Sequence, residues 1–91
     1  MKRSTRMSRV SWNYRVTHRP KSPMEGFQIR EVYYNDAGDI VMYSVDGITP
    51  FGDLVEELEV DMNYMVDAMN YASVNLDNVD YLLSIKDETG E

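Results

Sequence analysis

The side chains in this sequence that could bind a ligand or catalyse a reaction are mostly carboxylates. The chain holds 16 Asp and Glu residues, one histidine and no cysteine. The lack of cysteine excludes disulfides, thiolate zinc sites and cysteine nucleophiles. The histidine, His18, stands beside Arg19 and Pro20, and no neighbouring motif supplies a group to orient it as a general base. We therefore expect no catalytic residue, no metal site and no cofactor, and predict that the protein is not an enzyme.

Pairs of carboxylates occur at two places, and neither has the spacing of a metal loop. Asp36 and Asp39 flank Gly38, whereas a calcium loop needs more oxygen ligands at regular intervals. Asp77 and Asp80 stand near two asparagines, an arrangement that could hold a divalent cation but that we interpret as a helix cap or a solvated turn. The sequence has no glycine-rich phosphate loop and no nucleophile elbow. The carboxylates therefore indicate binding through charge rather than a reaction.

Charge is divided unevenly along the chain. Residues 1–24 hold seven Lys and Arg residues and no acid, whereas residues 25–91 hold two bases and all 16 acids, a net charge of −14. An acidic body repels nucleic acid and attracts basic surfaces, although it also serves solubility. We expect a basic protein partner, with nucleic acid bound only weakly, through a disordered basic leader at residues 1–9. No apolar run is long enough to cross a bilayer and no signal peptide is present, so we predict a cytoplasmic protein with no membrane partner.

One amphipathic helix over residues 53–72 is the longest regular element that the sequence predicts. Apolar residues recur along it every three or four positions, which predicts a face packed against the core. These residues are Leu54, Val55, Leu58, Met62, Met65, Val66, Met69 and Ala72. Asp53 and Glu56 have the spacing of a capping box, which favours a helix start at Asp53. The methionines could instead form an adaptable binding groove, but their spacing favours core packing.

The opposite side of this helix carries the candidate binding residues. The acidic ones are Glu56, Glu59 and Asp67, and the apolar ones are Val60, Tyr64 and Tyr71. The carboxylates could imitate the phosphate spacing of a nucleic acid toward a basic partner. The apolar row could bind a partner or form a dimer, or it could consist of scattered exposed residues of the kind common on proteins.

Three strands are predicted before the helix, over residues 11–18, 27–34 and 39–45. Polar and apolar residues alternate in the first strand, which places Trp12 and Tyr14 on one face. In the second strand Glu31 falls on the apolar face, so either it lies at an edge or a bulge shifts the register there. The turn residues 35–38 predict that the second and third strands form a hairpin.

The remaining segments complete an α+β prediction. We expect Phe51 to pack under the start of the helix. Residues 74–86 suit either a short helix capped by Asp77 or a strand, and we favour the helix. Residues 10–86 are predicted to form a single domain, followed by an acidic tail at residues 87–91. The predicted fold is a three-stranded antiparallel sheet packed by one long helix, β-β-β-α, with a short C-terminal appendage.

The passage from the hairpin into the helix resembles the N-terminal domain of HicB-type antitoxins. The residues concerned are Gly52, Asp53, Leu54, Val55, Glu56, Glu57 and Leu58. They form a Gly-Asp turn that leads into a helix opened by glutamates, and the similarity spans residues 27–71. The resemblance implies an inhibitor that binds a small basic RNase toxin. No DNA-binding segment follows the helix here, and the segment at residues 12–15 is not typical of that family.

These observations lead to one predicted function and two alternatives. We predict a small acidic binding module, an inhibitor or antitoxin-like protein whose partner is basic, such as a nuclease or a nucleic-acid-binding protein. An anti-defence inhibitor carried by a phage or mobile element would have the same charge and size. The first alternative is a homodimer formed through a sheet edge or through the row Val60, Tyr64 and Tyr71. The second is weak nucleic-acid binding through the basic leader.

Overall fold

A computed structural model describes residues 11–89, which form a small sheet with two long helices. The strands are β1 (Ser11–His18), β2 (Phe27–Tyr34), β3 (Ile40–Tyr43) and β4 (Val74–Asn75). The helices are α1 (Val55–Asp67) and α2 (Leu76–Thr89), with short 3₁₀ turns η1 (Pro23–Glu25) and η2 (Ala68–Asn70). The predicted α+β class is confirmed. The predictions for the leader at residues 1–9 lie outside the described residues.

The sheet is mixed, with the strand order β3-β2-β1-β4. β1 and β2 pair antiparallel from Ser11 opposite Tyr34 to His18 opposite Phe27, and β3 is antiparallel to β2. β4 pairs parallel to β1 over two residues. The prediction of a three-stranded, purely antiparallel sheet is therefore wrong in this detail, because a strand of two residues leaves no alternation in the sequence.

The hairpin of β2 and β3 is confirmed, and Asn35 holds its turn together. The carbonyl of Asn35 accepts a hydrogen bond from the N–H of Gly38 at 2.9 Å. Its side-chain Oδ1 accepts from the N–H groups of Ala37 and Asp39, each at 3.0 Å. Gly38 has a φ of +87°, a conformation that favours glycine. The predicted turn chemistry therefore fixes the register of this hairpin.

Glu31 lies neither at a sheet edge nor at a bulge, so that prediction is wrong. β2 is an inner strand in which Glu31 pairs regularly with Tyr14, and the register shift lies between Tyr33 and Tyr34. The hydroxyl of Tyr33, on the same face of the strand, donates to Oε1 of Glu31 at 2.7 Å. This hydrogen bond lets a carboxylate lie on an otherwise apolar face.

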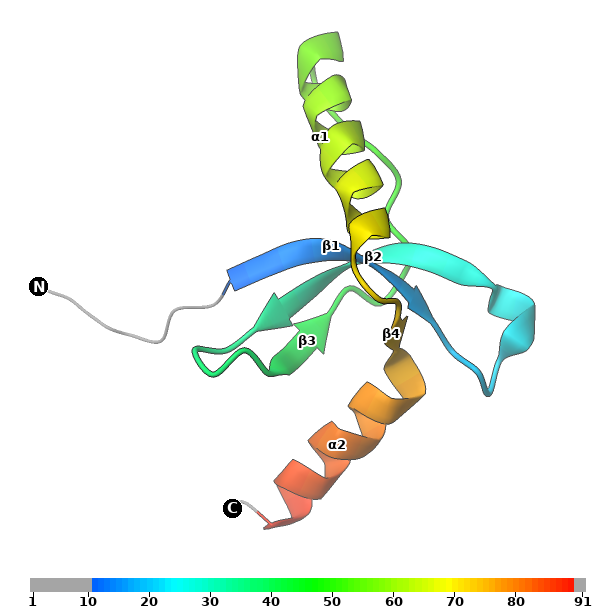
Figure 1. Ribbon diagram of the computed structural model, residues 1–91, viewed down its shortest axis with the longest axis vertical. Helices are drawn as coiled ribbons and strands as arrows, with labels where there is room; N and C mark the ends of the chain where they lie inside the picture. The colour runs from blue at the N-terminus through cyan, green and yellow to red at the C-terminus, as the bar shows by residue number, and fades with distance from the viewer. Residues whose placement is uncertain (1–10, 90–91) are drawn as a thin grey trace, which may run out of the picture.

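α1 stands away from the sheet instead of lying across it, and its apolar contact with the sheet is made at its C-terminal end (Figure 1). The contact is a small cluster of Tyr14, Met65 and Ala68, with Val16, Ile29 and Ile48 around it. Among the other residues of the predicted core face, Leu58 is half-buried and the rest are exposed: Leu54, Val55, Met62, Val66, Met69 and Ala72. The predicted core face is therefore wrong for every member except Met65 and, in part, Leu58.

The start of α1 is set by a close approach at Gly52. A Cβ on Gly52 would collide with the backbone of Glu57 and Leu58, so the incoming loop lies directly against the first helical turn. The helix begins at Val55, two residues after the predicted start. Phe51 is exposed, contrary to the expectation that it packs under the helix.

The predicted capping box is only half formed, and by a different residue. The backbone N–H of Asp53 donates to the carboxylate of Glu57 at 3.0 Å, whereas Glu56 does not take part. The N-cap residue is Leu54, which supplies no side-chain hydrogen bond. Because the helix starts later than expected, the glutamate that accepts the hydrogen bond from the N–H of Asp53 is Glu57, one residue after the predicted Glu56.

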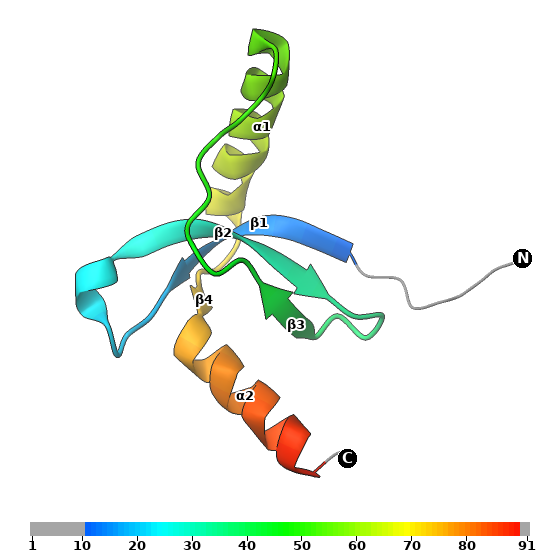
Figure 2. The same ribbon diagram turned by 180° about the vertical axis from the view of Figure 1, so that it is seen from behind.

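α2 leaves the sheet on the side opposite α1 (Figure 2). Its first turns pack in a second cluster formed by Val74, Leu76 and Val79, with Ile40, Tyr43 and Leu83 around it. The side chain of Asn75 accepts a hydrogen bond from the N–H of Asn78 at 3.1 Å, so Asn75 rather than Asp77 caps the helix. The preferred helix in this segment is confirmed from Leu76 onward. It continues to Thr89, so the predicted acidic tail begins inside α2.

Arg19, just after β1, connects α2 to β3. Its Nη1 lies 2.8 Å from Asp80 and 3.4 Å from Asp77, and its Nη2 donates to the hydroxyl of Tyr43 at 2.6 Å. Tyr43 in turn donates to Asp80 at 2.6 Å. Burial alone would raise the pKa of Asp80, but these hydrogen bonds from Tyr43 and Arg19 outweigh it and lower the pKa. The two aspartates, interpreted from the sequence as a cap or a solvated turn, instead bind a cation of the same chain.

Candidate protein-binding surface of α1

α1 exposes acidic and apolar side chains on more than one side. Its 13 residues include five Asp or Glu and no Lys or Arg. Val55 is 78% exposed at its start, and Met69, in η2 after its end, is 70% exposed. A helix that leaves so much apolar surface in water has the composition of an interface element. We therefore treat α1 as the candidate binding element.

All of the binding residues predicted from the sequence are exposed. They are Glu56, Glu59, Val60, Tyr64, Asp67 and Tyr71. The structure brings Tyr64, Asp67 and Tyr71 together at one pocket, which the other three do not line. Helical spacing therefore predicted the residues that α1 and the segment after it contribute to this pocket, but not the residues of β1 that complete it.

Asp61 connects the exposed helix to the sheet. Its Oδ1 accepts a hydrogen bond from the hydroxyl of Tyr14 at 2.6 Å, and its Oδ2 accepts from the backbone N–H of Phe51 at 2.9 Å. Burial and the hydrogen bond to Asp61 raise the pKa of Tyr14 well above its usual value. One carboxylate therefore joins β1, α1 and the loop that precedes α1.

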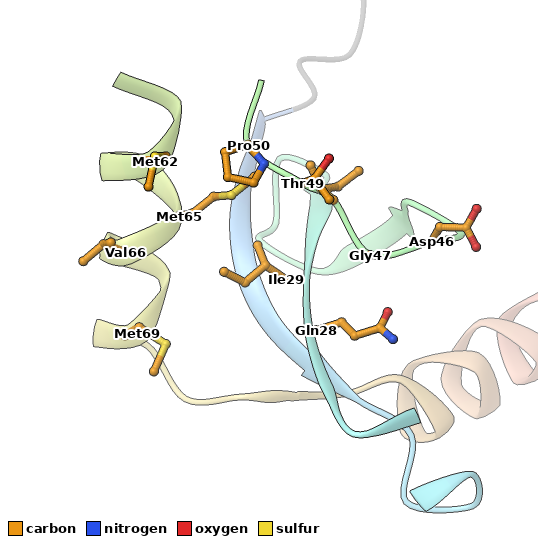
Figure 3. Close-up of a pocket in the computed structure, with 11 residues that line it drawn as sticks. Gln28, Ile29, Asp46, Gly47, Thr49, Pro50, Met62, Met65, Val66 and Met69 are labelled. Atoms are coloured by element: carbon orange, nitrogen blue, oxygen red, sulfur yellow. The ribbon is translucent and has the colours of Figure 1, made fainter. Parts of the chain in front are cut away.

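A groove of about 770 Å³ lies along one side of α1 (Figure 3). We call it the methionine groove, and its lining residues are Gln28, Ile29, Asp46, Gly47, Ile48, Thr49, Pro50, Met62, Met65, Val66 and Met69. Met65 points toward the strands, whereas Val66 points away from them (Figure 3). Unbranched, polarizable methionine side chains adapt to differently shaped partners. For Met62 and Met69 the structure favours the groove over the predicted core packing.

A second pocket of about 440 Å³ lies on the other side of α1, against the start of β1. We call it the aromatic pocket, and its lining residues are Trp12, Asn13, Tyr14, Tyr64, Asp67 and Tyr71. The rings of Trp12 and Tyr14 meet edge to face with their centroids 5.3 Å apart, which fixes one wall. The strand alternation had placed these two rings on one face, but no local signal showed that the end of α1 lies over them.

His18 makes a ring contact in the structure. It stacks on Phe27 with the ring centroids 4.8 Å apart. Among the side chains that the structure describes, residues 11–85, no group of three His, Asp or Glu lies close enough to hold a metal ion. No helix in the described part of the chain is long and apolar enough to cross a bilayer. The expectation that the protein is not an enzyme stays a prediction.

Comparisons of the chain with protein-family models, with curated proteins and with solved structures found no match. The resemblance to HicB-type antitoxins therefore stays a prediction.

Proposed function

We propose that this protein is a non-enzymatic binding module that holds a basic protein through α1. The observation that carries the proposal is the exposure of this helix, which projects from the sheet (Figure 1). Its five carboxylates face no Lys or Arg of the same helix. A partner that covers α1 must supply apolar groups for the methionine groove and positive charge for the carboxylates.

The predicted acidic residues share one side of α1, and Asp67 among them lines the aromatic pocket. Steps of three and eight positions keep Glu56, Glu59 and Asp67 on one side of a helix with 3.6 residues per turn. Exposed carboxylates mainly steer and orient a partner, whereas buried apolar contacts supply most of the affinity. A nuclease or nucleic-acid-binding protein offers a basic surface of the matching kind. An antitoxin-like or anti-defence inhibitor, such as one carried by a phage, is the version of the function that we propose.

Affinity purification with charge variants tests this proposal. The full chain serves as bait in lysate treated with nuclease, and the recovered partner is then titrated by calorimetry. The α1 variant carries Glu56→Gln, Glu59→Gln and Asp67→Asn, and the control carries Glu25→Gln, Asp36→Asn and Asp39→Asn. Both variants lose the same charge, and the control positions are exposed acids outside α1.

We expect a basic protein to be recovered at equal stoichiometry with the wild type and the control. The α1 variant should bind it roughly 10- to 100-fold more weakly, since each lost charge pair contributes up to about 1 kcal/mol. Equal affinities of the two variants would show that α1 is not the charged contact. Recovery that disappears with nuclease would instead support nucleic acid as the partner and reject the proposal.

A homodimer is the second candidate, favoured by the position of β3 at an edge of the sheet. An edge strand offers backbone groups that can pair with a second copy. A symmetric dimer through Val60, Tyr64 and Tyr71 would bring the carboxylates of two α1 helices close together. Repulsion between these like charges disfavours that dimer. Light scattering after gel filtration decides this point: one mass equal to the monomer at micromolar concentrations would remove the homodimer.

A further inference from the structure

We infer that the aromatic pocket receives an arginine side chain of the basic partner. The inference rests on the proposed function, because it names the group of that partner that enters the pocket. Guanidinium groups bind where aromatic faces and a carboxylate meet, since the planar cation stacks on the rings and donates to the carboxylate oxygens. The aromatic pocket supplies both kinds of group.

Two of the rings that line the pocket are available to a ligand. Trp12 is 50% exposed and Tyr64 is 63% exposed, so neither ring is buried in the core. Tyr71 already binds a guanidinium of its own chain, because Cζ of Arg15 lies 5.1 Å from its ring centroid. Arg15 is not among the residues that line the pocket, and its Nη atoms donate to the hydroxyl of Tyr34 and the carbonyl of Ala72. Tyr71 therefore already makes a cation–π contact with a guanidinium, the kind of contact that we assign to the partner.

Asp67 supplies the negative charge of the pocket. Its Oδ1 accepts a hydrogen bond from the side-chain amide of Asn70 at 2.9 Å. Its Oδ2 has no partner among the side chains described for residues 11–85, and no Lys or Arg belongs to the pocket lining. A second carboxylate, Asp61, is bound to the hydroxyl of Tyr14 at the pocket wall. Asp67 lines the pocket and Asp61 does not, so Asp67 is the carboxylate that offers a cation a partner in this space.

The chemistry of the pocket favours arginine over other occupants. An apolar side chain would cover Asp67 without giving it a hydrogen bond, which is costly for a carboxylate. The ammonium of lysine is compact and strongly hydrated, whereas a guanidinium is planar and gives up water more easily. Apolar groups of a partner can bind instead in the methionine groove, on the other side of α1. The aromatic pocket would therefore recognise charge, and the methionine groove would recognise apolar surface.

The only tryptophan of the chain reports directly on this pocket, because Trp12 forms part of its wall. We would titrate the full chain with a short polyarginine peptide and with polycitrulline, which has the same shape and no charge, while following Trp12 fluorescence. Saturable change is expected with polyarginine only, and it should persist at about 0.15 M ionic strength, where distant charges are screened. Asp67→Asn and Tyr64→Ala should each weaken binding by about 2- to 30-fold. Asp36→Asn, an exposed acid in the β2–β3 turn, is the matched control and should leave binding unchanged.

Three results would overturn the inference. The first is equal weakening by Asp36→Asn and Asp67→Asn, which would show only general attraction to an acidic protein. The second is an equal response to the two peptides. The third is much tighter peptide binding when Lys2, Arg3, Arg6 and Arg9 are replaced by Gln, which would show that the chain's own leader fills the pocket.

The purified partner separates this inference from the proposed function. A partner that binds Asp67→Asn and Tyr64→Ala as tightly as the wild type would overturn the pocket assignment and leave the binding function standing. Polyarginine binding with no basic protein recovered would support the pocket and reject the proposed function.

Discussion

Tyr14→Phe should lower the free energy of unfolding by about 1.5–2 kcal/mol, near the lower end of the range for a hydrogen bond to a charged group. The change keeps the buried ring that packs in the cluster with Met65 and Ala68. It removes only the hydroxyl that donates to Asp61 at 2.6 Å. The lower end of the range applies because Asp61 is half-buried and keeps its hydrogen bond from the N–H of Phe51.

Urea unfolding followed by circular dichroism measures this loss. The midpoint should fall with an unchanged slope, because unfolding exposes the same surface, and Tm should drop by about 6–16 °C for a domain of this size. Tyr33→Phe is the matched control. It also removes a phenol that donates to a carboxylate, but the 2.7 Å bond to Glu31 joins two residues of one strand. We expect the control to change stability by less than about 0.5 kcal/mol.

The phenol of Tyr14 adds a pH signature to the same experiment. Its pKa is raised, first by burial and then by the hydrogen bond to Asp61, so the folded state favours the neutral phenol. The resulting stability is fully present below about pH 10, the ordinary pKa, and is lost as the pH rises through the raised value. Tyr14→Phe should therefore lose less stability than the wild type in strong alkali. A Tyr14→Phe protein that matches Tyr33→Phe in midpoint and loses stability in alkali like the wild type would refute the role of this hydrogen bond.

Three further predictions concern the attachments of the two helices. Arg19→Ala should speed amide exchange in the first turns of α2 and leave α1 unchanged, because it removes the cation between Asp77 and Asp80. Since the pKa of Asp80 is lowered, its contribution is present above about pH 4 and is lost as the pH falls through the lowered value; Asp80→Asn should therefore flatten the fall of Tm in acid. Gly52→Ala should destabilise the protein by about 1–3 kcal/mol in urea unfolding, because its Cβ would collide with the first turn of α1, and an unchanged midpoint would contradict that close approach.

Local signals in the sequence predicted the local structure. β1 and β2 occupy the predicted ranges, and the hairpin turns at Asn35 and Gly38, because alternation and turn chemistry act over a few residues. The third strand is shorter than predicted, Ile40–Tyr43 instead of residues 39–45. β4 could not be predicted, since its two residues gain their conformation from pairing with β1.

The placement of α1 depends on tertiary contacts that periodicity does not report. An apolar stripe predicts that a face will be buried, but not which partner buries it. The side of α1 that meets β1 contains Asp61, a polar residue outside the predicted stripe. Asp61 can face the sheet because its carboxylate accepts a hydrogen bond from the hydroxyl of Tyr14. Of the stripe, Met65 packs against Tyr14 of the sheet, whereas Met62 and Val66 remain exposed. Tyr64 and Trp12 line the same pocket although they lie far apart in the sequence, which is why half of the aromatic pocket escaped prediction.

Tyr14 has two functions that different substitutions should separate. Its ring is a wall of the aromatic pocket, while its hydroxyl sets the position of α1 through Asp61. Asp61→Asn keeps every ring of the pocket but weakens the attachment of the helix. A partner that depends on a preformed pocket would then bind less tightly, because part of the binding energy is spent on holding α1 in place. A partner that binds α1 alone would be insensitive to this change, so the affinity for Asp61→Asn distinguishes recognition of an exposed helix from recognition of the helix and sheet together.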